Sequence, residues 1–404
     1  MKIRKLKIKN YKIFDDVEFD FTDAEGKTLD TIVLAGVNGC GKTTVLEVLK
    51  SLFMRDFSVY NNIEIEFELS VGERIISTSQ IPAIADNDPI LKKISRNNLT
   101  FNIEDGDLAS LRHFMELRSR ITNNENLIYL PISNNYEDQI FHKRITTLDL
   151  TSQKDELKEL VLKNLRDEVF KNKNLPPQKL IEDQIKNVTR AVELFDFNTH
   201  LVDFESEELV FESANGQRIY FKQLSHGEQN LYFRAIYLSQ LNLKDAIIMI
   251  DEPEAAFHPT WQQKIAQLYQ NVGENNQVFM ATHSPHIMAS VPPECLFMLH
   301  IDESEGKRKI QVINAAKAGK HSQGLEPDRI LKEIMQVKTL RDYETQRDID
   351  ELTRLLTLEA FESKRAEKLA DKLTDQLGRQ DPFIIRLEHQ MLMLRRKKPD
   401  LAVA

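Results

Sequence analysis

The stretch Gly36-Val37-Asn38-Gly39-Cys40-Gly41-Lys42-Thr43 matches the phosphate-binding pattern G-x-x-x-x-G-K-[ST] without a mismatch. An apolar run at residues 31–35 predicts a buried strand before this loop, and apolar residues at helical spacing from Val45 to Phe53 predict a helix after it. Glycines let backbone N–H groups converge on phosphate oxygens, and the N-terminus of the following helix favours negative charge. The order of strand, glycine loop and helix therefore predicts a phosphate-binding loop rather than a chance glycine-rich turn.

This loop supplies candidate residues for binding a nucleoside triphosphate. Lys42 would reach the β and γ phosphates, and the Thr43 hydroxyl would coordinate Mg²⁺. The residues expected to bind ATP are Gly36, Asn38, Gly39, Cys40, Gly41, Lys42, Thr43 and Thr44.

A second ligand for the metal is expected at the end of another buried strand. The apolar run at residues 246–250 is followed directly by Asp251-Glu252-Pro253. Asp251 would bind Mg²⁺ through its water shell, and Glu252 would polarise the attacking water as a general base. An acidic turn after a strand is common in isolation, but together with a phosphate-binding loop it indicates a hydrolytic site.

Two further stretches narrow the class of protein. Gln223-Leu224-Ser225-His226-Gly227-Glu228-Gln229 resembles the LSGGQ-type signature of ATP-binding-cassette ATPases. There a serine hydroxyl, a glycine backbone and a helix N-terminus form a second γ-phosphate cradle. The candidate contacts are Ser225, Gly227 and Glu228. Ala281-Thr282-His283-Ser284-Pro285 resembles the switch-histidine segment of the same ATPases, in which His283 would donate to the γ-phosphate and orient the water.

Taken in order, the four motifs resemble the soluble branch of the ATP-binding-cassette superfamily that is related to chromosome-maintenance and recombination ATPases. The resemblance implies an α/β fold: a P-loop NTPase head of ATP-binding-cassette type with a mixed sheet, a helical insertion and a C-terminal helical hairpin. It also implies that two heads sandwich two ATP molecules, with Ser225 and Gly227 of one copy capping the phosphate held by Lys42 of the other. We therefore expect a Mg²⁺-dependent ATPase that forms a homodimer or a higher homo-oligomer. The expected catalytic residues are Lys42, Glu252 and His283.

Three features depart from the superfamily pattern. His226 replaces the first glycine of LSGGQ, and residues 255–258 lack the aspartate expected after the catalytic glutamate. No motif marks the residue of the glutamine loop, and Gln139 is the candidate. These departures bear on the rate of hydrolysis more than on nucleotide binding.

The composition of the chain changes along its length, and this predicts four regions. They are residues 1–140 (N-terminal part of the head), 141–205 (helical insertion), 206–315 (C-terminal part of the head) and 316–404 (C-terminal helical interaction region). A hairpin turned at Asn215-Gly216 is expected over residues 207–221. Asp348-Ile349-Asp350 spells the D-x-D of a Toprim nuclease, but no strand precedes it, so we expect a solvated helix face and no nuclease chemistry.

The C-terminal region carries a separate, less specific resemblance. Residues 324–335, together with a helical segment containing LGRQDPFIIRLE, resemble the ATPase subunit of the bacterial Septu antiphage system and related retron-associated ATPases. Those ATPases act with a separately encoded HNH nuclease, which implies an HNH-type nuclease partner here. The alternative is a plain hairpin for dimerisation or for stabilising the head.

Composition and charge exclude several classes of protein. The chain has 54 basic and 63 acidic residues and a net charge of −9, so bulk charge gives no argument for nucleic-acid binding. Two cysteines cannot make a disulfide framework, and no apolar run is long enough for a membrane span, so we expect a cytoplasmic protein without a membrane partner.

The first twelve residues include six lysines and arginines, which alternate with apolar residues. Such a pattern predicts the solvated face of an edge strand, while contact with DNA or another nucleic acid is the alternative. Two other functions therefore stay open: a recombination-type DNA-repair ATPase that acts directly on DNA, and a regulatory nucleotide-binding scaffold with slow or no hydrolysis.

Overall fold

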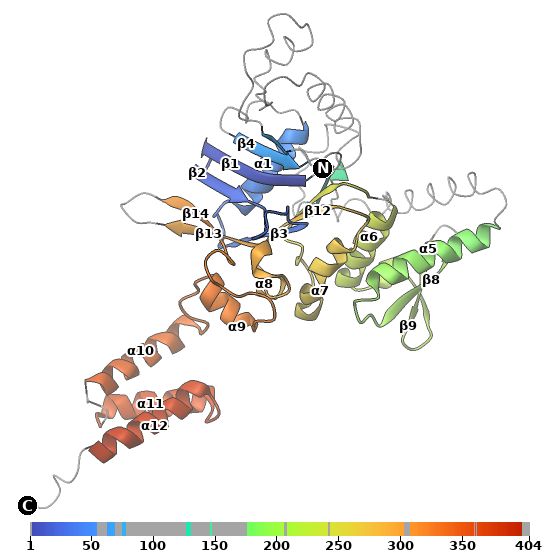
Figure 1. The fold of residues 1–404 in the computed structure, drawn as a ribbon. Helices are drawn as coiled ribbons and strands as arrows, with labels where there is room; N and C mark the ends of the chain where they lie inside the picture. Colours follow the sequence, from blue (N-terminus) through green and yellow to red (C-terminus); the bar gives the residue numbers. More distant parts are fainter. Residues whose placement is uncertain are drawn as a thin grey trace, which may run out of the picture. The chain divides into compact units, whose positions relative to one another are not determined.

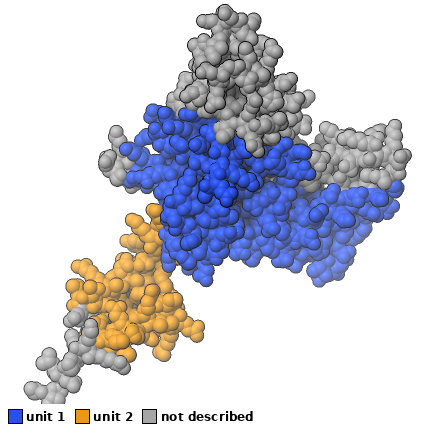
Figure 2. Space-filling model, viewed as in Figure 1, with its two compact units in different colours: residues 1–335 blue, residues 336–404 orange. Residues whose placement is uncertain are grey.

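The computed structural model describes residues 2–54, 63–68, 75–77, 127–130, 146–147, 176–205, 208–240, 243–302, 308–358, 360 and 362–397. The chain forms two compact units, Met1–Met335 and Gln336–Ala404, which are described separately (Figure 2). We call the first unit the head and the second the C-terminal unit.

The head is built on a seven-stranded sheet of order β14-β13-β3-β12-β11-β6-β7 (Figure 1). Its strands are β3 (Thr31–Gly36), β6 (Leu127–Leu130), β7 (Thr146–Thr147), β11 (Ile247–Asp251), β12 (Gln277–Thr282), β13 (Leu296–Asp302) and β14 (Lys309–Asn314). All neighbours pair in parallel except β13 and β14, so the sheet is mixed as predicted. Every residue of β3, β11 and β12 is buried, which explains their continuous apolar sequences.

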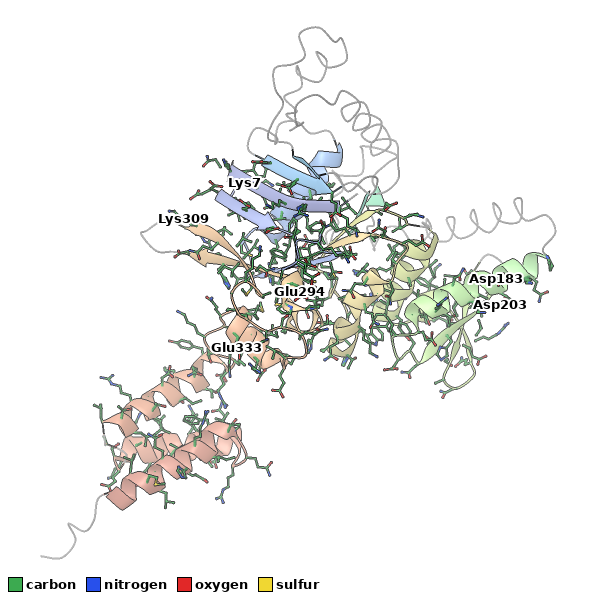
Figure 3. All side chains as sticks on the ribbon, viewed as in Figure 1. Lys7, Asp183, Asp203, Glu294, Lys309 and Glu333 are labelled. Carbon is green, nitrogen blue, oxygen red and sulfur yellow. The ribbon has the colours of Figure 1, made fainter. Side chains whose placement is uncertain are left out.

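A second, antiparallel sheet has the order β2-β1-β4-β5 and contains β1 (Lys2–Tyr11), β2 (Phe14–Asp20), β4 (Ile63–Glu68) and β5 (Ile75–Ser77). The prediction that the basic N-terminal strand lies at an edge is wrong, because β1 lies between β2 and β4. Lys5 stands opposite Asp20 on one side and Glu66 on the other. Lys7, labelled in Figure 3, stands opposite Glu18 and Glu64 in the same way. The alternating lysines therefore match alternating acids on both neighbouring strands.

Aromatic side chains fill the space between the two sheets. Phe21 of the loop after β2 contacts Phe279 of β12 and Phe297 of β13 edge-on, with ring centroids 5.3 Å apart in each pair. Phe19 of β2 packs beside Phe21 at 5.8 Å. All four rings are buried, so the second sheet is fixed against the first by a shared core.

The remainder of the head consists of helices and a small side lobe. Its helices are α1 (Lys42–Met54), α6 (His226–Gln240), α7 (Pro259–Gln270), α8 (Pro285–Met288) and α9 (Pro327–Arg329), the last followed by a π-helical turn, Ile330–Ile334. The lobe contains α5 (Pro177–Val192) and a three-stranded sheet of order β10-β9-β8 (Figure 1). Its strands are β8 (Thr199–Glu205), β9 (Glu208–Ser213) and β10 (Arg218–Tyr220).

The predicted hairpin is confirmed, because β9 and β10 pair around a turn in which Gly216 has φ +73°. The predicted helical insertion is wrong in part. Residues 177–192 are helical, but β8 lies inside the same predicted region and pairs with β9. Residues 151–175 lie outside the described residues.

Among its described residues, the C-terminal unit has three helices, α10 (Tyr343–Thr357), α11 (Lys364–Leu377) and α12 (Pro382–Lys397). The predicted helical hairpin is present as α11 and α12, and α10 packs against it as a third helix that was not predicted. Residues 316–335 belong to the head, where Ile330 and Ile334 are in the core, and the boundary lies at residue 336 rather than 316. Asp348 is helical as predicted but buried rather than solvated, since it pairs with Lys372 of α11 and with Arg347.

Within the described part of the chain, neither unit has a helix with the length and apolar character that a bilayer crossing requires. Cys40 and Cys295 are both buried and unpaired, in agreement with the absence of a disulfide framework.

Candidate active site

The glycine loop joins β3 to α1, and two of its glycines cannot be replaced without a clash. A Cβ on Gly36 would lie 2.4 Å from the carbonyl oxygen of Leu299, and one on Gly41 would lie 2.5 Å from the ring of Phe14. Gly41 also has φ +100°, a conformation that other residues rarely adopt. The loop tip at Asn38 and Gly39 is exposed. The loop therefore has the tight turn and the accessible backbone that phosphate binding requires.

Lys42, the first residue of α1, is buried, and its ammonium group folds back over the loop. Its Nζ donates to the carbonyl oxygens of Gly36 (2.9 Å) and Val37 (3.1 Å) and lies 3.5 Å from Nδ1 of His283. Burial lowers the pKa of Lys42. The ammonium group of Lys42 thus lies beside the imidazole ring of His283.

Asp251 ends β11 next to the start of α1, and its buried carboxylate accepts a hydrogen bond from the side chain of Thr43. Burial raises the pKa of Asp251 to about 6, and the negative charges of Glu252 and Glu254 act in the same direction. Thr43 and Asp251 together offer the hydroxyl and carboxylate oxygens that Mg²⁺ prefers, and a cation beside them would offset the repulsion among the acidic groups. These residues therefore fit a Mg²⁺ ion.

Glu252 follows Asp251 with its backbone in the left-handed region, at φ +45°. Its carboxylate Oε1 lies 3.9 Å from Nε2 of His283, and about a third of the Glu252 side chain is exposed. Burial, together with the nearby charge of Lys42, lowers the pKa of His283. A neutral imidazole between a lysine and a partly exposed carboxylate suits the orientation of a water molecule.

The signature residues lie at the start of α6, where Ser225 caps the helix. The Ser225 hydroxyl donates to Oε2 of Glu228 (2.7 Å), and the backbone N–H of Glu228 donates back to the Ser225 hydroxyl (3.3 Å). The other carboxylate oxygen of Glu228 accepts from Thr199 (2.8 Å). Glu228 is therefore occupied as a capping residue, while Ser225 and His226 are exposed.

Gly227 contacts the turn that follows β11. A Cβ there would lie 3.0 Å from the indole of Trp261 and 3.2 Å from the carbonyl oxygen of Ala256. A larger residue at this position would push the signature helix away from the turn that carries Glu252.

The structure brings together the loop, β11 and β12 residues predicted from the sequence, because the three strands are adjacent and parallel and end at one edge of the sheet. The described contacts of the signature residues are instead with one another, with the lobe and with the turn after β11. Gln139, the candidate for the glutamine loop, lies outside the described residues.

Two residues that support the site were not foreseen. Arg234 of α6 is buried and donates from Nη1 to the carbonyl oxygen of Pro253 (3.1 Å) and to the hydroxyl of Tyr269 (2.8 Å). Glu254 accepts three hydrogen bonds from the segment around His283. The spacing in Asp251-Glu252-Pro253-Glu254 could have marked Glu254, whereas no local signal marks Arg234.

Several known proteins are similar to this chain. The Septu protein PtuA of Bacillus thuringiensis is 25% identical over 170 residues, which cover 38% of this chain and 42% of that protein. The Septu protein PtuA of Bacillus mycoides (strain KBAB4) is 21% identical over 320 residues, covering 75% of this chain and 41% of its own length. A retron Vc95 probable ATPase of Vibrio cholerae is 33% identical over 91 residues, covering 20% of this chain and 18% of its own.

These matches confirm the predicted resemblance to Septu and retron ATPases, although the chain spans less than half the length of these relatives. Among solved structures, the SMC head domain from Thermotoga maritima is 13% identical, with 78% of this chain and 99% of that one covered and a TM-score of 0.44. Residues 32–289, more than half of the chain, match the family described as "AAA domain, putative AbiEii toxin, Type IV TA system", and the chain belongs to that family.

Proposed function

We propose that this chain is an ATP-binding and ATP-hydrolysing switch subunit of an antiphage defence complex, which gates a separately encoded HNH-type nuclease through ATP-dependent dimerisation of its head. The convergence of the motif residues at one edge of the sheet carries the ATPase part of the proposal. Lys42 Nζ lies 3.5 Å from Nδ1 of His283, and Nε2 of His283 lies 3.9 Å from Oε1 of Glu252. The Thr43 side chain is hydrogen-bonded to Asp251 at the same edge. The family match and the named Septu and retron relatives support the defence role.

In the hydrolytic step, the residues of the chain would hold the triphosphate and orient a water molecule. The glycine loop and Lys42 would bind the phosphates, while Thr43 and Asp251 would hold Mg²⁺, which supplies positive charge to the phosphate oxygens. Glu252 is placed to accept a proton from the attacking water, and the neutral His283 to orient it. Electrostatic positioning of this kind is the main source of rate enhancement in phosphoryl transfer.

Dimerisation would complete the site. Ser225 is exposed at the N-terminus of a 15-residue helix, where backbone N–H groups and the helix dipole favour a phosphate. A second copy could present this cap to the triphosphate held by Lys42. Release of the γ-phosphate would then remove a bridging ligand and weaken the dimer.

The nuclease partner rests only on what the resemblance to Septu and retron ATPases implies, and the C-terminal unit is its candidate binding region. The alternative is a RecF-like DNA-repair ATPase that acts directly on DNA. The basic N-terminal strand was one argument for it, and the structure weakens that argument. The basic residues of β1 lie opposite acidic residues of β2 and β4, which offsets the positive charge that a phosphate backbone would need.

The test is ATP turnover with and without Mg²⁺, combined with light scattering to measure the mass in solution. We expect Lys42→Ala to abolish nucleotide binding, and Glu252→Gln to bind ATP, hydrolyse it at least about 100-fold more slowly and accumulate as a dimer. If wild-type turnover stays unmeasurable while ATP still binds, the protein is a nucleotide-binding scaffold. Salt-dependent binding of isolated protein to DNA junctions, without a co-purifying nuclease, would favour the repair alternative.

A further inference from the structure

The turn that follows β11 carries a third acidic residue, Glu254, beyond the two that the motif assigns. Its Oε1 oxygen accepts hydrogen bonds from the Thr282 hydroxyl (2.7 Å), the His283 backbone N–H (2.7 Å) and the Ser284 backbone N–H (2.9 Å). One carboxylate oxygen thus binds three consecutive residues at the end of β12.

His283 is consequently held from two directions. Its ring lies between Lys42 Nζ and Glu252 Oε1, at 3.5 and 3.9 Å, while its backbone N–H is bonded to Glu254. The Glu252 backbone N–H also donates to the carbonyl oxygen of Ala281 (2.8 Å), which fixes the turn against β12. Two glutamates of one turn therefore face the same histidine, one at its ring and one at its backbone.

The second oxygen of Glu254 contrasts with Oε1. Oε2 is buried and has no hydrogen-bond partner among the described residues. An unpaired buried carboxylate oxygen is unfavourable for stability, so the residue is better explained by what Oε1 does for the switch segment.

We propose that Glu254 is a positioning residue of the hydrolytic site, whose carboxylate fixes the backbone of Thr282, His283 and Ser284 and so keeps the His283 ring between Lys42 and Glu252. This inference rests on the proposed ATP hydrolysis. Glu254 acts through His283 and needs no contact with the nucleotide. Its function requires an acceptor oxygen at this point rather than a negative charge.

A double-mutant cycle with His283 tests the proposal. We expect Glu254→Ala to lower kcat about 100-fold, since a misplaced catalytic group has effects of this order, and to change KM for ATP less than about 3-fold. Glu254→Gln, which keeps an acceptor oxygen, should stay within about 5-fold of wild type. In a His283→Ala background, Glu254→Ala should cost less than about 3-fold further. Equal losses in both backgrounds, or a Gln variant as slow as the Ala variant, would overturn the proposal.

Amide hydrogen exchange gives a second readout that does not depend on turnover. We expect the His283 amide to exchange at least about 10-fold faster in Glu254→Ala than in wild type or Glu254→Gln, because its acceptor is removed. Amides of β3 should be unchanged, and the exposed residue Glu274, which pairs with Lys244, offers a neutral control as Glu274→Ala. Unchanged exchange at His283 would reject the positioning role. A wild-type protein without ATPase activity would instead reject the proposed function and leave this readout in force.

Discussion

At the scale of single residues, Asp251 lowers the stability of the ligand-free protein. Its carboxylate is buried next to two further acidic side chains, and its pKa is raised to about 6. When the pKa of an acid is higher in the folded state than in the unfolded state, folding takes up a proton at pH values between the two pKa values. The free energy of unfolding should therefore fall as the pH rises from about 4 to about 6, and stay lower above that range.

This reasoning gives the first prediction, for the substitution Asp251→Asn. In the absence of Mg²⁺ and nucleotide, we expect the variant to be more stable than wild type at pH 7.5, by on the order of 1–3 kcal/mol, and by about half as much at pH 5, in the middle of the titration range. Urea unfolding at the two pH values measures the difference. A variant that is less stable than wild type at pH 7.5 would show that the Asp251 charge is well compensated in the free protein.

The second prediction compares two glycines of the same loop that share a left-handed backbone. Gly41 has φ +100° and no room for a Cβ beside Phe14, whereas Gly39 has φ +76° and open space around it. We expect Gly41→Ala to destabilise the protein by about 2–4 kcal/mol and to abolish ATP binding, and Gly39→Ala to cost about 1 kcal/mol. Thermal unfolding and nucleotide titration measure both effects. Equal costs for the two variants would mean that backbone strain, not the contact with Phe14, sets the requirement.

At the scale of secondary-structure elements, Gln277 connects the two sheets of the head. This fully buried residue at the start of β12 accepts from the Ile3 N–H (2.6 Å) and donates to the carbonyl oxygens of Ile3 (2.8 Å) and Leu29 (3.0 Å). The amide thereby satisfies three backbone groups that would otherwise be buried without partners.

The third prediction follows from these contacts. Gln277→Leu keeps the size of the side chain but leaves those backbone groups unpaired, so we expect a loss of about 3 kcal/mol in the free energy of unfolding. Gln270→Leu is the matched control, because Gln270 is exposed and makes one side-chain hydrogen bond, to Thr31 (3.1 Å). That variant should lose less than about 1 kcal/mol in the same urea titration. A small loss for Gln277→Leu would show that water replaces the amide.

The strands of the central sheet could be predicted because burial on both faces leaves an unbroken apolar run, as at residues 247–251. The position of β1 between two strands could not be predicted. Its second partner, β4, begins only at Ile63, and the pairing of the β4 acidic residues with the lysines of β1 depends on a strand register that the sequence does not reveal. Local sequence therefore indicated a strand but not its neighbours.

Within the site, Lys42, Asp251 and His283 could be predicted because each belongs to a motif that ends a buried strand or begins a helix. The sequence spacing after Asp251 marks Glu254 only as a further acidic residue of the same turn. The contacts of Glu254 and Arg234 could not be predicted, since they depend on the path of that turn. The left-handed backbone of Glu252 directs that turn, and only the folded structure shows that its carboxylate and carbonyl groups meet β12 and α6. Residues that position the catalytic groups are thus harder to predict from the sequence than the catalytic residues themselves.

At the scale of the whole molecule, the described residues form two separate hydrophobic cores. The core of the C-terminal unit consists of Ile349, Leu352, Leu356, Ala366, Leu369, Leu373, Ile384 and Leu387, all from α10, α11 and α12. Polar contacts add to it within the unit, including the two hydrogen bonds from Arg341 to Asp381 (2.8 and 2.9 Å). The predicted hairpin did not include α10. The few apolar residues of α10 do not by themselves indicate a helix that packs against α11 and α12 in the same core.

Because each core is formed from one unit alone, we expect the two units to unfold independently. Leu352 is fully buried in α10, so Leu352→Asp should unfold the C-terminal unit. The melting temperature of the head should then shift by less than about 2 °C, as it should when residues 336–404 are deleted. Ile248→Asp, at an equally buried position in β11, is the matched control and should unfold the head instead. Calorimetry of the full chain resolves the two transitions, and a head that melts more than about 5 °C lower without residues 336–404 would show that the units stabilise each other.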